Sequence, residues 1–131
     1  MSQSRAIDYE NASDAVRAVY DEIKTLRKVD RVNNFWTHIA VDEKMLRRIW
    51  NNVKEVMAPG ALDPLVKELI YIAVSVTNNC RYCIASHRAG AIRAGMTEEQ
   101  FNELMAVVAL ANETNRLAIG YNIPIDPQFE Q

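Results

Sequence analysis

Long apolar runs are missing from this 131-residue sequence, although 49% of its residues are hydrophobic. The longest apolar stretch, residues 69–76, is far shorter than the ~20 residues that a membrane-spanning helix needs. The N-terminus carries Arg5 but no apolar core after it, so it lacks the pattern of a signal peptide. We therefore expect a cytoplasmic protein that does not bind a membrane.

Large fields of one charge are also missing. The chain has 15 Lys and Arg residues against 17 Asp and Glu residues, and its net charge is -2. The basic residues stand singly or in pairs such as Arg47 and Arg48, so the sequence predicts no basic surface large enough for nucleic acid. A chain of this length and hydrophobic content suits one compact domain, residues 1–131, with a hydrophobic core.

Strand signals and internal repeats are absent from the sequence as well. Apolar residues instead recur every three or four positions, which predicts an all-α fold, a compact bundle of about six to seven helices. The main helices are expected over residues 13–27, 42–57, 63–77, 80–94 and 97–120. Capping side chains mark four of the starts, at Ser13, Asp42, Asp63 and Thr97, the last of these in a capping box.

The two ends of the chain lack a helical period. Residues 1–12 are polar and are expected to form a mobile or partner-contacting arm. Residues 121–131, with Pro124 and Pro127, are expected to form an extended tail. The predicted domain is therefore a helical bundle with an arm before it and a tail after it.

Cysteine is scarce, and the two residues present, Cys80 and Cys83, lie three positions apart. In a cytoplasmic protein such a close pair favours redox chemistry or metal binding over a structural disulfide. His87, one of the two histidines, follows four residues after Cys83. The other, His38, lies in an aromatic patch with no partner spaced to join it, so it is left out of the predicted site.

The spacing of these residues has a geometric meaning if Cys80 opens a helix. Cys83 and His87 then share one helix face with it, and His87 can take a thiol proton or stabilise a thiolate. A disulfide between cysteines three apart requires distortion of the first turn, so it would be easily reduced. The spacing predicts an activated thiol pair suited to turnover, and by itself it leaves open which sulfur attacks.

The motif extends backwards to Glu68, twelve residues before Cys80. Glu68, Cys80, Cys83 and His87 together resemble the E-x11-C-x2-C-x3-H signature of the alkyl hydroperoxidase D group in the carboxymuconolactone decarboxylase-like family. The match covers about residues 63–120. The resemblance implies an all-α fold of that group, with the C-x-x-C motif at the start of a central helix.

The resemblance also implies roles for these residues in a thiol-dependent peroxidase. Cys83 attacks the hydroperoxide and becomes a sulfenic acid, Cys80 condenses with it to a disulfide, and Glu68 and His87 relay the proton. No metal or cofactor is expected. Without the resemblance, Glu68 is equally well explained as a first-turn residue favoured by the helix dipole, with Tyr71 on part of its face.

Expected partners follow from the same resemblance. They are a hydroperoxide substrate, a lipoyl-type or thioredoxin-type dithiol reductant, and further copies of the chain in a trimer or hexamer. Apolar residues on nearly every side of the helix expected over residues 63–77 are compatible with an oligomer. Two features depart from the family pattern: Tyr82 replaces the histidine that the best-known members have between the cysteines, and the chain looks like the shorter, single-motif form.

Three alternatives stay open. The first is a zinc site in which Cys80, Cys83, His87 and Glu68 are the four ligands, although this crowds three ligands onto two helical turns. The second is a non-catalytic helical interaction protein whose thiols are small buried hydrophobes. The third is a carboxymuconolactone decarboxylase-type enzyme, in which the two thiols would have no assigned task.

Overall fold

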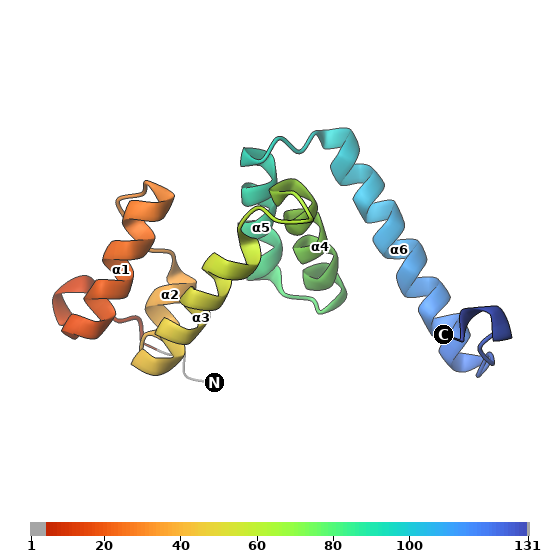
Figure 1. The fold of residues 1–131 in the computed structure, drawn as a ribbon, viewed down its shortest axis with the longest axis horizontal. Helices are drawn as coiled ribbons and strands as arrows, with labels where there is room; N and C mark the ends of the chain where they lie inside the picture. Colours follow the sequence, from red (N-terminus) through yellow and green to blue (C-terminus); the bar gives the residue numbers. More distant parts are fainter. Residues whose placement is uncertain (1–4, 131) are drawn as a thin grey trace. The chain divides into compact units, whose positions relative to one another are not determined.

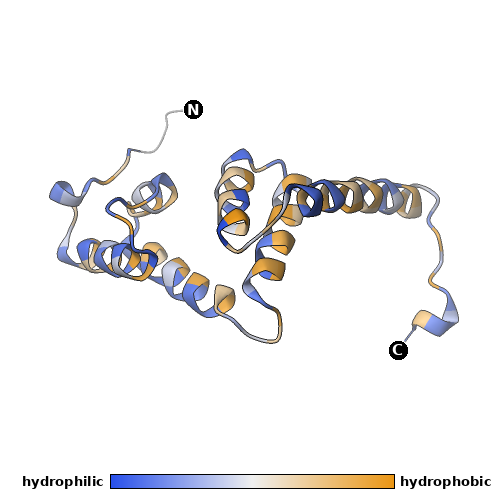
Figure 2. Ribbon diagram, turned by 90° about the horizontal axis from the view of Figure 1, so that it is seen from above, coloured by the Kyte–Doolittle hydropathy of each residue, from blue (hydrophilic) through white to orange (hydrophobic). Residues whose placement is uncertain are grey.

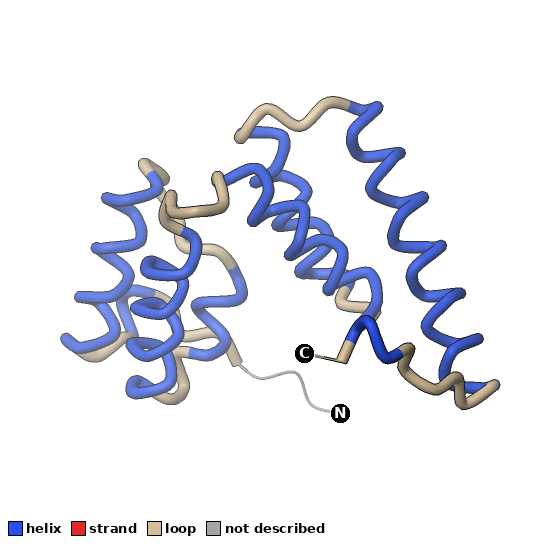
Figure 3. The backbone as a smooth tube through the Cα atoms, turned by 45° about the vertical axis from the view of Figure 1, so that its right-hand side comes forward, coloured by secondary structure: helices blue, strands red, loops and turns tan. Residues whose placement is uncertain are grey.

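A computed structural model describes residues 5–130 of the chain, and in this range every regular element is helical (Figures 1 and 3). The expected all-α class is confirmed. Two short 3-10 helices, η1 and η2, flank six α-helices. The elements are η1 (Tyr9–Asn11), α1 (Asp14–Arg27), α2 (Asn34–Ile39), α3 (Glu43–Met57), α4 (Pro64–Thr77), α5 (Arg81–Arg93), α6 (Glu98–Gly120) and η2 (Pro127–Phe129).

The helix starts follow the capping signals in the sequence. The side chains of Ser13, Asp42 and Asp63 each accept a backbone N–H three positions later, which satisfies a donor that has no partner within the helix. At Thr97 the capping box forms both of its bonds, with lengths of 3.1 and 2.9 Å to Gln100. None of the described helices is both long enough and apolar enough to cross a membrane.

The chain divides into two compact units, Met1–Ala58 and Pro59–Gln131. The first unit contains α1, α2 and α3 around its own core. The indole rings of Trp36 and Trp50 meet edge to face in this core, with centroids 5.4 Å apart. The buried members are Val16, Val19, Tyr20, Ile23, Val32, Trp36, Ala40, Leu46 and Trp50.

The described part of the expected N-terminal arm, residues 5–12, is bound to the first unit. Ile7 donates its N–H to the Thr37 carbonyl at 2.9 Å, and its own carbonyl accepts the Tyr20 hydroxyl at 2.8 Å. Ile7 and Ala12 also pack against the core. Residues 5–12 of the expected mobile or partner-contacting arm are therefore packed on the first unit, where two apolar side chains and two hydrogen bonds fix them. Residues 1–4 of the expected arm lie outside the described residues.

The second unit contains α4, α5 and α6. Helices α4 and α5 pack along each other, and α6 contacts α4. Its core cluster consists of Ile72, Ala91 and Met96, with partly buried apolar side chains around them. Asn112 of α6 donates to Thr77 Oγ1 at 3.1 Å, a polar link between α6 and the end of α4.

Much apolar surface of the second unit is exposed. Figure 2 colours hydrophobic and hydrophilic residues along the ribbon of α6, the long helix that leads towards the C-terminus. The exposed fraction of Leu110 is 61%, and Ile119 reaches 71%. The expected extended tail is largely irregular, interrupted by the single turn of η2, and Gln131 lies outside the described residues.

Candidate active site

The turn between α4 and α5 places the C-x-x-C motif. The Cys80 N–H donates to the Ser75 carbonyl at 2.9 Å, and the Asn79 N–H donates to the Val76 carbonyl at 3.1 Å. These two bonds form a Schellman motif, in which the residue after the helix cap is left-handed. Asn79 fills that position with a φ of 56°, a conformation that asparagine tolerates better than most residues. The cap that ends α4 thus fixes the backbone of Cys80.

Cys80 is also the N-cap of α5. Its sulfur accepts the backbone N–H of Cys83 at 3.3 Å, in the way that a serine or aspartate oxygen normally does. The motif therefore lies at the start of this helix, as expected. Both cysteines are free thiols and are partly buried.

The surroundings shift the pKa values of the two thiols in opposite directions. A hydrogen bond from the Cys83 thiol, with help from the backbone N–H groups of Cys83 and Tyr82, lowers the pKa of Cys80 below its ordinary value. Burial raises the pKa of Cys83 to about 11, and the hydrogen bond and negative charge of Cys80 act in the same direction. Of the two thiols, Cys80 is therefore the one that loses its proton first.

Glu68 and His87 meet across α4 and α5. The Glu68 Oε2 atom lies 2.7 Å from Nδ1 of His87, and the side chains are only 19% and 22% exposed, respectively. A carboxylate at this position fixes the imidazole tautomer, because Nδ1 must carry the proton that it donates. The other nitrogen, Nε2, is then free of a proton in the neutral ring and can act as a base.

The ring of Tyr71 packs against one face of the same imidazole. Its ring is stacked on the His87 ring with centroids 3.6 Å apart and an angle of 18° between the planes. Burial raises the pKa of the Tyr71 phenol, and so does negative charge on Cys83, Cys80 and Glu68. Tyr71 was not among the site residues predicted from the sequence. Its spacing of three residues from Glu68 on one helix was the available signal.

The four predicted residues do not gather as metal ligands. Between residues 5 and 130, no group of three or more His, Cys, Asp and Glu side chains is arranged to hold a metal ion. Glu68 instead directs a carboxylate oxygen at the imidazole. Among the described residues the geometry therefore shows a carboxylate–imidazole contact and no four-ligand arrangement for zinc.

His38, which was excluded from the site, lies in the first unit. Its Nδ1 atom is 2.7 Å from the carbonyl of Asn34, one turn earlier in α2. This bond within a single helix accounts for its orientation.

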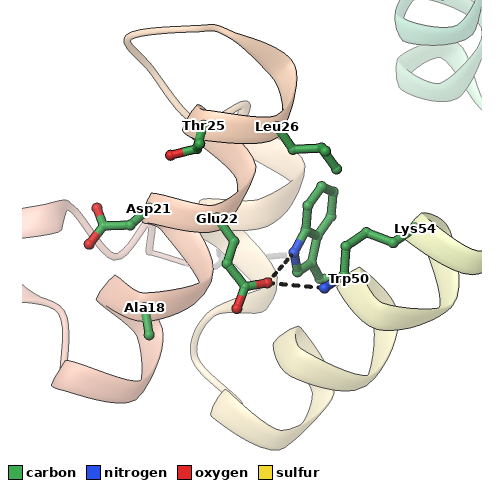
Figure 4. Close-up of a pocket in the computed structure, with 7 residues that line it drawn as sticks. All are labelled: Ala18, Asp21, Glu22, Thr25, Leu26, Trp50 and Lys54. Atoms are coloured by element: carbon green, nitrogen blue, oxygen red, sulfur yellow. Dashed lines mark hydrogen bonds and ion pairs between the residues drawn. The ribbon is translucent and has the colours of Figure 1, made fainter.

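A separate hollow lies between α1 and α3 in the first unit (Figure 4). Its volume is about 470 Å³, and none of the predicted site residues lines it. Glu22 accepts hydrogen bonds there from Trp50 Nε1 at 3.0 Å and from Lys54 at 3.1 Å. A third donor, Arg47, lies 2.8 Å from the other carboxylate oxygen. These groups satisfy one another, so the hollow is explained by the packing of the first unit.

The fold and the site together define a class: an all-α protein with a C-x-x-C pair at the start of one helix and a glutamate–histidine pair between that helix and the one before it. Residues 43–121 match the model of the carboxymuconolactone decarboxylase family. The chain belongs to this family, and the resemblance to its alkyl hydroperoxidase D group is confirmed by the structural similarity described next.

One solved structure is similar over nearly the whole chain. The crystal structure of the alkylhydroperoxidase AhpD core from Rhodospirillum rubrum superimposes with a TM-score of 0.92 at 44% sequence identity, and the match covers 98% of this chain and 97% of that one.

Two curated relatives match over shorter segments. The alkyl hydroperoxide reductase AhpD of Coxiella burnetii is 26% identical over 100 residues, which are 74% of this chain and 56% of that protein. A protein of Paracoccus denitrificans named "Uncharacterized protein 4 in cox locus" is 46% identical over 56 residues, 43% of this chain and 50% of that protein. The matches span about half the length of these two relatives.

Proposed function

We propose that this protein is a thiol-dependent peroxidase that reduces hydroperoxides through Cys80 and Cys83, with Glu68 and His87 as its proton relay. The observation that carries the proposal is the 2.7 Å contact between Glu68 and Nδ1 of His87, which lies on the same helix as the free thiol of Cys83 and one turn after it. The activity named for the relatives from Rhodospirillum rubrum and Coxiella burnetii supports the same chemistry.

The first half of the cycle consumes the peroxide. His87 takes the thiol proton of Cys83 at Nε2, while Glu68 stabilises the imidazolium through Nδ1. The Cys83 thiolate attacks the distal peroxide oxygen, so that an S–O bond forms as the O–O bond breaks. The leaving alkoxide takes the proton from His87 and departs as an alcohol. Cys83 is then a sulfenic acid.

The second half uses the acidic sulfur. Cys80 attacks the sulfur of the sulfenic acid, an S–S bond forms as the S–O bond breaks, and hydroxide leaves as water after it gains a proton. The lowered pKa of Cys80 suits this step, because it favours the thiolate form that attacks the sulfenic acid. Because its pKa is raised, Cys83 can attack only if a base removes its proton, and His87 is the base in this proposal. An external dithiol of lipoyl or thioredoxin type then reduces the disulfide.

We further propose that the protein works as a homo-oligomer, a trimer or hexamer, in the cytoplasm. The exposed apolar residues of α6 and of the segment after it support association between copies, because monomeric proteins rarely expose large apolar patches. The members are Val107, Leu110, Leu117, Ile119, Tyr121, Ile123, Ile125 and Phe129.

The test is peroxide turnover with a lipoyl or thioredoxin-type dithiol as reductant, combined with trapping of sulfenic acid by dimedone. We expect Cys80→Ser to stop after one turnover and to carry dimedone on Cys83, and Cys83→Ser to consume no peroxide. A Glu68→Gln variant should lose about 100-fold in turnover, a typical share for general acid–base catalysis. Dimedone on Cys80 in the Cys83→Ser variant would reverse the two sulfur roles.

The family also contains the decarboxylase reaction for which it is named, and this candidate needs no thiol oxidation. The same variants separate the two. A lactone decarboxylase would keep its activity when both cysteines are replaced by serine, whereas a dithiol peroxidase would lose all of it. Wild-type protein that consumes no peroxide with either dithiol would contradict the proposed function.

A further inference from the structure

Gly90 stands in the interior of α5 without a conformational reason. After proline, glycine is the least favourable residue inside a helix. Among the glycines, only Gly95 has a positive φ, which its place in the turn after α5 requires. Gly90 therefore has a backbone that alanine would adopt more readily, and another constraint must account for its small size.

That constraint is the carboxylate of Glu68. A Cβ atom on residue 90 would lie 2.9 Å from Oε1, 3.0 Å from Cδ and 3.1 Å from Oε2 of Glu68, all closer than ordinary van der Waals contact. No other glycine is placed in this way. A Cβ on Gly120, also in a helix, would meet nothing within 4 Å.

The position of Gly90 links this contact to His87. Gly90 follows His87 by three residues on α5, so the two share a helix face. Glu68 reaches that face from α4, where its carboxylate lies against Gly90 and hydrogen-bonds His87 Nδ1 at 2.7 Å. The carboxylate therefore occupies the space that a side chain on residue 90 would fill.

We propose that Gly90 is a positioning residue: its missing side chain makes the space in which Glu68 meets His87. Its consequence for catalysis rests on the proposed function, whereas its effect on the imidazole does not. The atoms that a Cβ would meet are the end of a flexible side chain, so Gly90→Ala displaces the carboxylate rather than α4. The fold is retained while the hydrogen bond between Glu68 and His87 is lost.

The direct test is the tautomer of His87 in long-range ¹H–¹⁵N spectra, recorded on the reduced protein at a pH at which the imidazole is neutral. The chain has two histidines, and His38, whose Nδ1 lies 2.7 Å from the Asn34 carbonyl, serves as an internal reference. We expect wild type and the matched control Gly120→Ala to keep the His87 proton on Nδ1. Gly90→Ala should move it towards Nε2, with His38 unchanged.

A double-mutant cycle shows whether Gly90 acts through Glu68. Glu68→Ala removes the carboxylate, so adding Gly90→Ala to it should change the His87 spectrum no further. In the peroxidase assay, Gly90→Ala should lower kcat about tenfold with little change in KM, since general acid–base catalysis is impaired and not abolished. The thermal midpoint of Gly90→Ala should stay close to that of the wild type, because the helix preference of alanine offsets the loss of the hydrogen bond between Glu68 and His87.

An unchanged His87 tautomer in a folded Gly90→Ala variant would overturn the proposal. So would an unfolded variant, because the proposal requires that only the carboxylate gives way, and so would a further change in the Glu68→Ala background. Failure of the proposed function has a different signature: wild type would then consume no peroxide while the His87 tautomer still responded to Gly90→Ala.

Discussion

Cys80 and Cys83 lie in the same first turn of a helix, yet their neighbours shift the pKa values of the two thiols in opposite directions. Cys80 is the N-cap and receives donors from Cys83 and Tyr82, which stabilise negative charge on its sulfur. Cys83 lies inside the helix, where burial and the nearby Cys80 sulfur oppose a second charge. Two sulfurs of the same chemical type thus differ in how readily they lose a proton, Cys80 more readily and Cys83 less.

This difference predicts the order of alkylation. With iodoacetamide near neutral pH, Cys80 of the reduced protein should be modified about tenfold faster than Cys83, because only the thiolate reacts. Peptide mass spectrometry after quenching at short times measures both rates. Cys83→Ala removes the thiol that donates to Cys80, so alkylation of Cys80 should slow in that variant. Faster labelling of Cys83 in the wild type would contradict the assigned acidities.

Three consecutive helices of the second unit end in the same way. Helices α4, α5 and α6 are each followed by a residue with positive φ, which is Asn79, Gly95 and Asn122, respectively. In each case the next residue donates its N–H to a carbonyl five positions earlier. At the end of α4 this cap has a second task, because the residue that closes it is Cys80.

Substitution at Asn79 therefore affects stability and thiol chemistry together. Asn79→Gly should be nearly neutral, whereas Asn79→Val should cost about 1–2 kcal/mol in the free energy of unfolding, because a β-branched residue resists positive φ. Asn122→Val is the matched control in the cap after α6. It should cost a similar amount and leave Cys80 alkylation unchanged, whereas Asn79→Val should slow it. Equal rates of Cys80 alkylation in the two valine variants would contradict the proposed effect of the α4 cap on the Cys80 thiol.

In the first unit, α1 and α3 are joined by a charged cluster. Hydrogen bonds from Arg47 and Lys54 lower the pKa of Glu22 to about 2, below its ordinary value of 4.5. The folded state therefore binds this proton less readily than the unfolded state. The stability that Glu22 contributes is present above pH 4.5 and is lost as the pH falls towards 2.

Glu22→Gln should lower the free energy of unfolding by about 1 kcal/mol at neutral pH, a small value because the carboxylate is 42% exposed and solvent screens it. Urea titrations followed by tryptophan fluorescence measure this difference, which should shrink as the pH is lowered from 4.5 towards 2. Glu55→Gln, which removes a charge from the surface of α3, is the control and should change stability by less than about 0.5 kcal/mol. A difference that stays constant with pH would contradict the depressed pKa.

At the scale of the whole molecule, the two units differ in how much they bury. The first unit has nine buried residues in its hydrophobic cluster, whereas the cluster of the second has three. Leu110 and Ile119 of α6 are 61% and 71% exposed in the single chain. Such exposed apolar surface on a helix is typical of an interface, and the proposed binding partner is a second copy of the chain.

Light scattering coupled to size exclusion should therefore give a mass three or six times the 14.9 kDa of one protomer. Leu110→Glu places a charge on the exposed apolar face and should shift the protein towards smaller species. Asn102→Glu adds the same charge to an exposed polar position of α6 and should leave the mass unchanged. A wild-type protein that runs as a monomer at micromolar concentration would contradict the oligomer.

Much of the fold was predictable because its signals are local. The capping residues at Ser13, Asp42, Asp63 and Thr97 and the glycine at Gly95 mark where helices begin and end, and the structure places them there. The packing of the N-terminal segment on the first unit was not predicted. Its attachment depends on Ile7 meeting Thr37 and Tyr20, which are distant in the sequence. Division of the chain into two compact units was likewise not expected.

The sequence by itself determined the helices, the family signature and the presence of two thiols and a histidine on one helix face, since spacing within one helix fixes all of these. Only the tertiary structure decided the rest of the candidate site. Packing of α4 against α5 brings Glu68 to His87, stacks Tyr71 on the imidazole and requires Gly90 to lack a side chain. These are contacts between helices, and their distances depend on how the helices pack and not on any periodicity within one of them.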